Sequence, residues 1–291
     1  MQDISLEEAI AAAVEEFVEV GIPTPEIDAL LLAGHVLHLG RGEMTARVIS
    51  GDILTPEQVD QFERLVVRRA TREPLQHITG VAAFRRLELA VGPGVFVPRP
   101  ETELLVQMVV DAAVASGAPS PRVIDLGTGS GAIALAVATE VPHAEVWAVE
   151  ASPEALAWAE RNNARLGDPV HLIAGDLRDA PQMLGDAAGT FDVVVSNPPY
   201  IPDEATPRDA EVRLYDPPMA LYGGHDGLAV VRSIAAVAAR LVHSGGLLAL
   251  EHGELQGAAI RDILQDAGWV QVTTHPDLTT RDRYTTALRL A

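Results

Sequence analysis

Four consecutive residues, Asn197, Pro198, Pro199 and Tyr200, carry the most specific chemical signal in the sequence. Proline has a fixed φ and no backbone N–H, so the Pro198 carbonyl can be held outward without competition from neighbouring donors. The Asn197 side-chain oxygen and this carbonyl can each accept one hydrogen from an NH₂ group, while the Tyr200 ring offers a flat face to a planar substrate. We therefore predict that Asn197 and Pro198 are catalytic and that all four residues bind the substrate.

This acceptor pair suits methylation of a carboxamide nitrogen. An amide nitrogen is a poor nucleophile because its lone pair is delocalised into the carbonyl group, and two fixed acceptors direct that lone pair toward a methyl carbon. Each neutral hydrogen bond contributes only about 1 kcal/mol, so the main advantage is correct positioning. No strong general base is needed, because the nitrogen becomes more acidic as it gains the methyl group. The structural alternative is an ordinary turn rich in Asn and Pro.

A glycine loop followed by an acidic residue predicts a cofactor that contains a nucleoside. The loop closes one predicted strand, opens a predicted helix and consists of Gly127, Thr128, Gly129, Ser130 and Gly131. About 20 residues later, Glu150 ends the next strand, where a carboxylate can accept hydrogen bonds from ribose hydroxyls. With Ala132 the loop also fits the dinucleotide pattern G-x-G-x-x-A, so an NAD-dependent oxidoreductase is an alternative. Hydride transfer, however, has no need of the acceptor pair.

The elements that must position these residues are strands that alternate with helices from residue 123 onward. This alternation predicts an α/β, doubly wound, mostly parallel sheet of Rossmann-like type. The seven expected strands are Val123–Leu126, Glu145–Val149, Val170–Ile173, Phe191–Val195, Gly246–Glu251, Val270–Thr274 and Thr285–Leu290. A loop joins the last two, which predicts an antiparallel pair at one edge. Ligands of such sheets bind beyond the carboxyl ends of the strands, so the glycine loop, Glu150 and Asn197 should face one crevice.

The N-terminal part of the chain is expected to be helical. Ser5, with Glu8 three residues on, has the pattern of a capping box, and Thr55 before Pro56 is a natural N-cap with proline at the first helical position. Another helix is predicted to start near Pro25.

Three domain ranges follow from these patterns. Residues 1–80 are predicted to form a small helical domain, to which the family resemblance described below adds a role in substrate recognition, and residues 81–100 a linking β-hairpin. Residues 101–291 are predicted to form the catalytic domain.

Composition excludes several classes of site. The chain has no cysteine, which removes disulfides, thiolate metal sites and cysteine nucleophiles, and its nine histidines are scattered, so no metal is expected. With 41 acidic and 21 basic residues the net charge is −20, which disfavours stable nucleic-acid binding. No apolar run approaches the roughly 20 residues of a membrane span, so a cytoplasmic protein without membrane contact is expected.

Beyond these features, the chain resembles the PrmC/HemK family of peptide chain release factor N5-glutamine methyltransferases. The resemblance covers nearly the whole sequence and rests on residues 73–80 (EPLQHITG), residues 96–103 (FVPRPETE), the glycine loop and Asn197 to Tyr200. It implies a seven-stranded methyltransferase sheet and the cofactor S-adenosyl-L-methionine, with S-adenosyl-L-homocysteine as product. It also implies a protein partner, a class I peptide chain release factor methylated on the glutamine of its Gly-Gly-Gln loop, with the N-terminal domain helping recognition.

The resemblance further implies which residues bind the cofactor. They are the five loop residues together with Glu150, Asp176, Leu177 and Asn197. Family members often have aspartate where this chain has Glu150, and tryptophan where it has Leu177. Loss of the aromatic ring predicts weaker packing on adenine and a lower cofactor affinity.

Other interpretations remain open from the sequence. An adenine-N6 nucleic-acid methyltransferase could use the same acceptors around an exocyclic amine, and a binding protein could be built on an inactive methyltransferase domain. Arg99, Glu101 and Glu103 fit either an interdomain ion-pair cluster or the acidic first turn of a helix over Thr102–Val114.

Overall fold

The computed structural model describes residues 4–290 and divides the chain into two units. The first unit contains Met1–Val81 together with Arg208–Tyr215, and the second contains Ala82–Pro207 and Asp216–Ala291. No sequence pattern predicts that residues 208–215 belong with the N-terminal segment.

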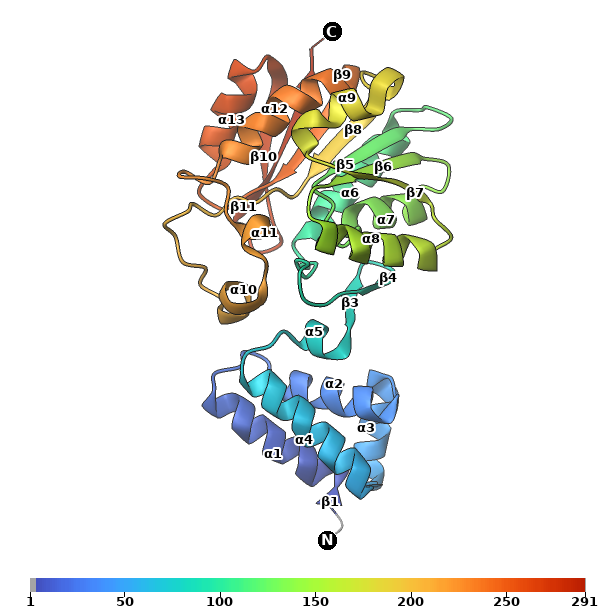
Figure 1. The fold of residues 1–291 in the computed structure, drawn as a ribbon, viewed down its shortest axis with the longest axis vertical. Helices are drawn as coiled ribbons and strands as arrows, with labels where there is room; N and C mark the ends of the chain where they lie inside the picture. The colour runs from blue at the N-terminus through green and yellow to red at the C-terminus, as the bar shows by residue number, and fades with distance from the viewer. Residues whose placement is uncertain (1–3, 291) are drawn as a thin grey trace. The chain divides into compact units, whose positions relative to one another are not determined.

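Helices build the first unit, and most of its buried side chains are apolar (Figure 1). Its elements are β1 (Ile4–Ser5), α1 (Leu6–Glu19), α2 (Pro25–Leu37), α3 (Arg41–Ser50), β2 (Ile53–Leu54), α4 (Pro56–Ala70), α5 (Leu75–Thr79) and α10 (Ala210–Tyr215). The predicted helix starts are confirmed, because Ser5 and Thr55 each form a complete capping box and Pro25 is the first residue of α2. These caps satisfy backbone N–H groups that the first helical turn leaves without partners.

A seven-stranded sheet forms the centre of the second unit. In spatial order its strands are β10 (Trp269–Pro276), β11 (Asp282–Arg289), β9 (Val242–Glu251), β8 (Phe191–Ser196), β5 (Arg122–Leu126), β6 (Glu145–Glu150) and β7 (Val170–Ala174). The five strands from β9 to β7 run parallel, whereas β11 is antiparallel to both β9 and β10. The predicted mostly parallel sheet with an antiparallel pair at its edge is therefore confirmed.

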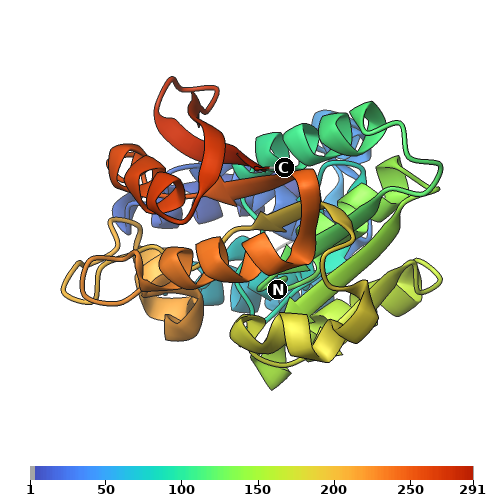
Figure 2. The same ribbon diagram turned by 90° about the horizontal axis from the view of Figure 1, so that it is seen from above.

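Helices cover both faces of this sheet, as expected for a doubly wound fold (Figure 2). One core contains α6 (Thr102–Ala115) and α7 (Ala132–Glu140), and the other contains α9 (Ala180–Leu184), α12 (Ala229–Leu241) and α13 (Gly257–Asp266). Neighbouring strand residues alternate between the two: Val123 packs into the first core and Ile124 into the second. Both faces are apolar because parallel strands are buried on both sides.

A β-hairpin is present within residues 81–100, as predicted, with β3 (Val81–Phe84) and β4 (Leu87–Ala90) paired in a two-stranded sheet. Asn162 links its end to the glycine loop, since the side chain bonds both backbone groups of Ala90 and donates to the Ser130 carbonyl at 2.9 Å. Asn162 lies on α8 (Pro153–Arg165); the remaining short elements are η1 (Leu177–Asp179), η2 (Gly185–Ala187) and α11 (Pro218–Leu221).

Among the helices of residues 4–290, none has both the length and the apolar character required to cross a membrane.

Candidate active site

The strand register brings the predicted site segments to one edge of the sheet. Asp125 of β5 lies opposite Ala148 of β6 and Val195 of β8, so the segments that follow these strands leave the sheet side by side. The Ser196 hydroxyl donates to the Leu126 carbonyl at 2.6 Å and ties the end of β8 to the end of β5. Strand order reverses between β5 and β8, which is where ligands of open α/β sheets bind.

The glycine loop turns sharply after β5. Its turn is fixed by the Val149 carbonyl, which accepts hydrogen bonds from the Gly127 and Thr128 amides at 2.9 and 3.1 Å. Gly127 and Gly129 have φ values of +78° and +60°, a conformation that side chains rarely adopt. A Cβ atom at either position would meet nothing within 4 Å, so this side of the loop is open. The loop thus combines a turn that glycine adopts readily with free space that a ligand can occupy.

Glu150, buried at the end of β6, is bonded to the loop. Its Oε2 accepts from the Gly129 amide at 2.7 Å, and its Oε1 accepts from the Ser152 amide at 2.8 Å. A carboxylate has about four acceptor positions, so two are filled and two remain for ribose hydroxyls. The glutamate is therefore compatible with a ribose site.

Asp125 is a site residue that the sequence did not single out. Burial raises the pKa of its carboxyl to about 7, against the lowering effect of a 2.6 Å hydrogen bond from the Thr128 hydroxyl, and the Glu150 charge raises it further. The carboxyl is fully buried, and a hydrogen bond from the Ala134 backbone also lowers its pKa.

Asp176 and Leu177 follow the end of β7. Asp176 caps η1 by accepting from the Arg178 amide at 2.9 Å, and hydrogen bonds from the Arg178 side chain hold the pKa of its carboxyl below the usual range. Leu177 is half-buried and packs against the second core. Both residues therefore lie beyond the carboxyl end of a strand that neighbours β6.

The segment Asn197 to Tyr200 is held by two glycines that allow close packing of its backbone. A Cβ atom on Gly223 would lie 2.4 Å from the Pro199 carbonyl oxygen, and one on Gly227 would lie 2.3 Å from the Tyr200 carbonyl oxygen. Gln256 also donates to the Tyr200 carbonyl, at 2.9 Å. These two carbonyls are thus directed into the protein. The Pro198 carbonyl differs, because no hydrogen bond within the described chain reaches it.

The Asn197 side chain is oriented by two residues that the sequence did not connect with it. Its Nδ2 lies 3.3 Å from Thr102 Oγ1, and the Thr102 hydroxyl donates to Glu251 Oε2 at 2.7 Å. Glu251 is buried, which raises the pKa of its carboxyl to about 7 against the lowering effect of the Thr102 hydrogen bond. The hydrogen bonds of residues 4–290 leave Asn197 Oδ1 without a donor. Asn197 Oδ1 and the Pro198 carbonyl oxygen are therefore both available as acceptors.

Tyr200 cannot act as a base in this site near neutral pH. Burial raises the pKa of its hydroxyl to about 12, and the neighbouring Glu251 charge adds to the effect. The ring stays neutral and can contribute a flat apolar surface.

The charged residues near the start of α6 form local contacts within the second unit, so the interpretation as an interdomain ion-pair cluster is wrong. Arg99 pairs with Asp216 at 2.9 Å, and Glu103 accepts from the Arg85 amide at 2.9 Å. The predicted helix start at Thr102 is confirmed.

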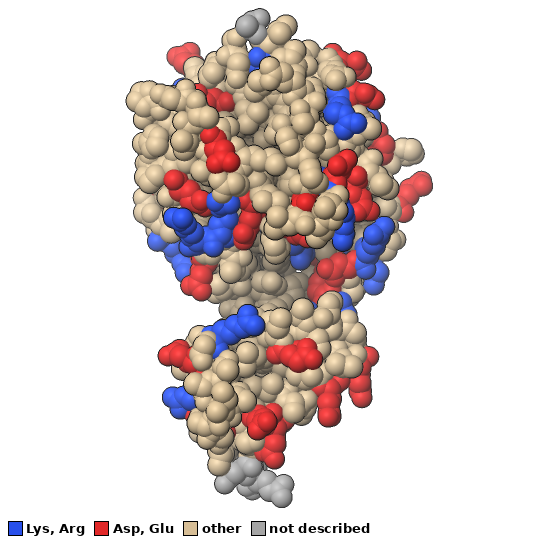
Figure 3. Space-filling view, turned by 180° about the vertical axis from the view of Figure 1, so that it is seen from behind, with Lys and Arg blue, Asp and Glu red and all other residues tan. Residues whose placement is uncertain are grey.

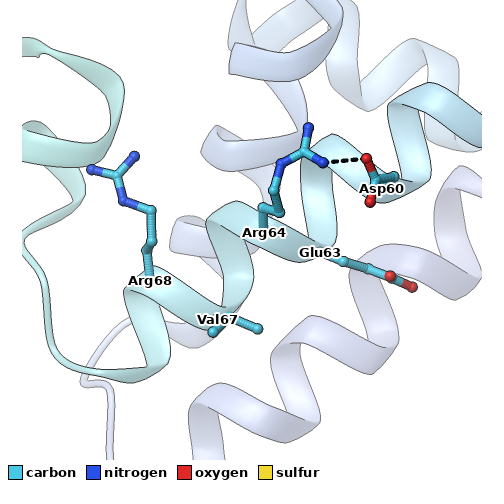
Figure 4. A pocket seen from close by; sticks show the side chains of 5 residues that line it. All are labelled: Asp60, Glu63, Arg64, Val67 and Arg68. Carbon is cyan, nitrogen blue, oxygen red and sulfur yellow. Dashed lines mark hydrogen bonds and ion pairs between the residues drawn. The ribbon is translucent and has the colours of Figure 1, made fainter.

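Within residues 4–290, no group of three or more His, Asp and Glu side chains has an arrangement that could hold a metal ion. An open hollow lies along α4 of the first unit and is lined by Asp60, Glu63, Arg64, Val67 and Arg68 (Figure 4). Arg64 forms an ion pair with Asp60, and the hollow contains none of the predicted site residues.

Comparison with known proteins matches two family models. Residues 8–80 match the PrmC N-terminal domain, and residues 87–216 match the methyltransferase small domain. The chain is 48% identical to a release factor glutamine methyltransferase of Mycolicibacterium smegmatis, over 98% of each chain. It is 45% identical to one of Streptomyces coelicolor, over 96% of each chain. A methyltransferase structure from Pyrococcus furiosus matches 77% of this chain and 99% of its own at 20% identity, with a TM-score of 0.52, a likeness of fold.

Proposed function

The chain belongs to the family of release factor glutamine methyltransferases, and on this premise we propose that it transfers a methyl group from S-adenosyl-L-methionine to a protein glutamine. The target atom is the side-chain nitrogen, N5, of the Gly-Gly-Gln glutamine in a class I peptide chain release factor. The observation that carries this proposal is the pair of free oxygens, Asn197 Oδ1 and the Pro198 carbonyl, beside the glycine loop.

The residues that would hold the cofactor lie at four neighbouring strand ends, those of β8, β5, β6 and β7. Glu150 binds the ribose hydroxyls, and the open side of Gly127 and Gly129 leaves room for the cofactor. The other cofactor contacts are assigned to Thr128, Ser130, Gly131, Asp176, Leu177 and Asn197. The cofactor supplies an electrophilic methyl group bonded to a positively charged sulfur.

The chain's own residues orient the nucleophile. Asn197 Oδ1 and the Pro198 carbonyl each accept one N–H of the substrate carboxamide, which fixes the plane of the amide and turns its nitrogen lone pair toward the methyl donor. Pro199 and Tyr200 hold the carboxamide from the side, and the Tyr200 ring covers its planar face. Positioning of this kind can supply several kcal/mol toward the reaction barrier. The proton is lost after the nitrogen has gained the methyl group, so no side chain with a tuned basic pKa is required.

The partner is a protein, in agreement with the charge of the chain. A net charge of −20 disfavours nucleic acid, whose binding depends on Lys and Arg contacts to phosphates. On the face drawn in Figure 3, basic side chains stand beside acidic ones and form no continuous basic area. We assign release factor recognition to residues 1–80, the link to residues 81–100 and catalysis to residues 101–291, and we place the enzyme in the cytoplasm.

A labelling experiment tests the proposal. The protein is incubated with methyl-labelled S-adenosyl-L-methionine and a class I release factor, and in parallel with the same factor whose Gly-Gly-Gln glutamine is replaced by glutamate, which has no amide nitrogen. We expect label on the first factor alone, located on the glutamine by peptide mass spectrometry. Label that persists on the replaced factor, or transfer to adenine in DNA or RNA offered at low salt, would overturn the assignment.

A further inference from the structure

A continuous chain of hydrogen bonds connects the buried Glu251 carboxyl to the predicted catalytic amide. Glu251 lies at the end of β9, and the register of β8 with β9, in which Ser196 is opposite Leu250, places it level with Asn197. Thr102, the first residue of α6, bridges the two at 2.7 and 3.3 Å. The three residues come from three separate elements, so this chain exists only in the folded sheet.

The direction of each hydrogen bond in this chain is dictated by the carboxylate. An ionised carboxyl group can only accept, so the single Thr102 hydrogen must point to Glu251. The Thr102 oxygen then has only lone pairs left for Asn197, and it can only meet the NH₂ end of that side chain. The Asn197 oxygen is forced to the opposite side, where the proposed carboxamide substrate is bound. Without this constraint the Asn197 amide could turn over and present donors to the substrate, which also brings donors.

From this chain we infer that Thr102 and Glu251 are positioning residues that fix the orientation of the Asn197 amide so that its oxygen faces the substrate. The inference rests on the proposed function, since it assumes that Asn197 accepts a hydrogen bond from a carboxamide. Neither residue touches the reacting atoms; both act through Asn197.

The elements that pack against Glu251 carry charged and titratable groups. Arg283 on β11 favours the charged form of Glu251, whereas Glu101 before α6 disfavours it. A hydrogen bond from the Asn197 side chain also favours the charged form, so Glu251 acts on the Asn197 NH₂ group directly as well as through Thr102. Tyr200 after β8 and Tyr284 on β11 stay neutral, because burial and the Glu251 charge raise the pKa of each hydroxyl. Glu251 is thus the group of this cluster that changes charge near neutral pH.

Protonation of Glu251 would remove the constraint. A protonated carboxyl can donate to Thr102 Oγ1, and the Thr102 hydrogen is then free to point at Asn197 Oδ1, which reverses the chain. Because the active arrangement needs the ionised form, turnover should fall as the pH is lowered through the pKa of Glu251, which is about 7.

The first test removes the bridging hydroxyl while keeping the side-chain shape. Thr102→Val should lower kcat about 10- to 100-fold, the range expected for a misdirected catalytic group, with KM for the release factor and the cofactor Kd changed less than about 3-fold. Thr102→Ser restores the hydroxyl and should restore most of the rate. Thr139→Val is the matched control, because the Thr139 hydroxyl bonds only to the Leu135 carbonyl of its own helix. An unchanged kcat in Thr102→Val, or equal losses in Thr102→Val and Thr139→Val, would overturn the inference.

The second test uses the pH profile, which a merely structural role would not alter. Wild-type kcat should show an acidic limb near pH 7, and Glu251→Gln should have a lower kcat without that limb. Asp125 has a carboxyl pKa in the same range, so a limb that persists unchanged in Glu251→Gln belongs to another group and overturns the inference. Both tests require a wild-type protein that methylates glutamine. If the wild type does not catalyse this reaction, the proposed function is wrong. If the wild type is active and Thr102→Val has the same rate, only the positioning role is wrong.

Discussion

Two buried glutamates, one in each unit, show how differently a folded chain can use a carboxyl group. Glu211 of α10 meets two arginines, with Arg69 Nη2 and Arg72 Nη2 at 2.8 and 2.7 Å from its oxygens. Glu251 at the end of β9 has no salt-bridge partner in the described chain and accepts instead from a threonine hydroxyl. Burial opposes ionisation of both. At Glu211, hydrogen bonding with Asp209, Arg72 and Arg69 outweighs burial and holds the pKa well below its usual value.

The difference separates a carboxylate that holds structure from one that orients a neighbour. The Glu211 charge is neutralised by arginines, one of which, Arg69, also binds Asp28 at 2.7 Å, so the cluster joins α2, α4 and α10 in one unit. The Glu251 charge is left poorly compensated, which is costly for stability but keeps its protonation sensitive to pH near neutrality. The arrangement at Glu211 therefore stabilises the first unit, whereas the arrangement at Glu251 is suited to a role in the active site.

The largest effect should come from removing the Glu211 charge. Glu211→Gln leaves Arg72 without a charge partner and Arg69 paired with Asp28 alone, and should destabilise the first unit by about 3 kcal/mol. All three tryptophans lie in the second unit, so hydrogen exchange in α2 and α4 should accelerate while the fluorescence-detected urea midpoint stays nearly constant. The matched control is Asp60→Asn, which breaks the exposed pair with Arg64 on α4 and should cost less than about 0.5 kcal/mol. Equal effects of the two variants would show that Glu211 does not stabilise the first unit in this way.

A loss of similar size is expected at Asn197, the residue that Glu251 and Thr102 orient, but in the rate of the reaction and not in stability. Asn197→Ala removes one of the two proposed substrate acceptors and should lower turnover about 100- to 1000-fold, as loss of a preorganised hydrogen-bonding group does in other enzymes. Cofactor affinity should change less. Single-turnover kinetics with calorimetry separates the two quantities, and a variant that keeps its rate but loses cofactor binding would contradict the assignment.

The contributions of the two glutamates to the free energy of unfolding should also depend on pH in opposite directions. The folded-state pKa of Glu251 is raised from 4.5 to about 7, so the folded state retains a proton that the unfolded chain releases, and wild type should lose stability relative to Glu251→Gln as pH rises from about 4.5 to 7. The pKa of Glu211 is lowered, so its stabilising contribution is present above 4.5 and is lost as pH falls below that value. Urea unfolding of the wild type and both glutamine variants at pH values from about 3 to 8 covers both pH ranges. It measures how much the free energy of unfolding of each variant differs from that of the wild type. Parallel curves for the two variants would remove the distinction.

The smallest effect is expected at Leu177, which we propose lies beside the adenine of the cofactor. Leu177→Trp adds an aromatic surface worth about 0.5 to 1.5 kcal/mol and should tighten S-adenosyl-L-methionine binding about 2- to 10-fold. Leu177 is only half-buried, so the larger side chain has access to solvent and need not displace the core. Isothermal calorimetry that finds no gain in affinity would refute the view that Leu177 weakens the cofactor site.

Local patterns in the sequence predicted most of the sheet. Buried parallel strands are continuous apolar runs, and glycine after the first of them marks the turn toward a cofactor, so the seven strands and the positions of Gly127, Glu150 and Asn197 at one edge follow from the printed residues. Caps such as Ser5 and Thr55 are equally local, because each depends on residues three positions apart.

The contacts that join distant segments were not predictable in this way. Thr102 was expected only to start a helix, yet its hydroxyl meets a carboxyl 149 positions away. Glu211 meets Arg69 across 142 positions, and no hydrophobic period or spacing relates the two. Asp125 carried no signal of its own because its raised pKa results from burial by the whole sheet.

The discontinuous first unit has a consequence for synthesis on the ribosome. Residues up to Val81 emerge more than a hundred positions before Arg208–Tyr215, the segment that completes their unit. At 5 to 20 residues per second, the nascent N-terminal helices wait on the order of ten seconds with Arg69 paired to Asp28 alone. A shortened gene that begins at residue 82 would likewise produce Glu211 without either arginine, so a stand-alone catalytic fragment should be designed with that glutamate replaced.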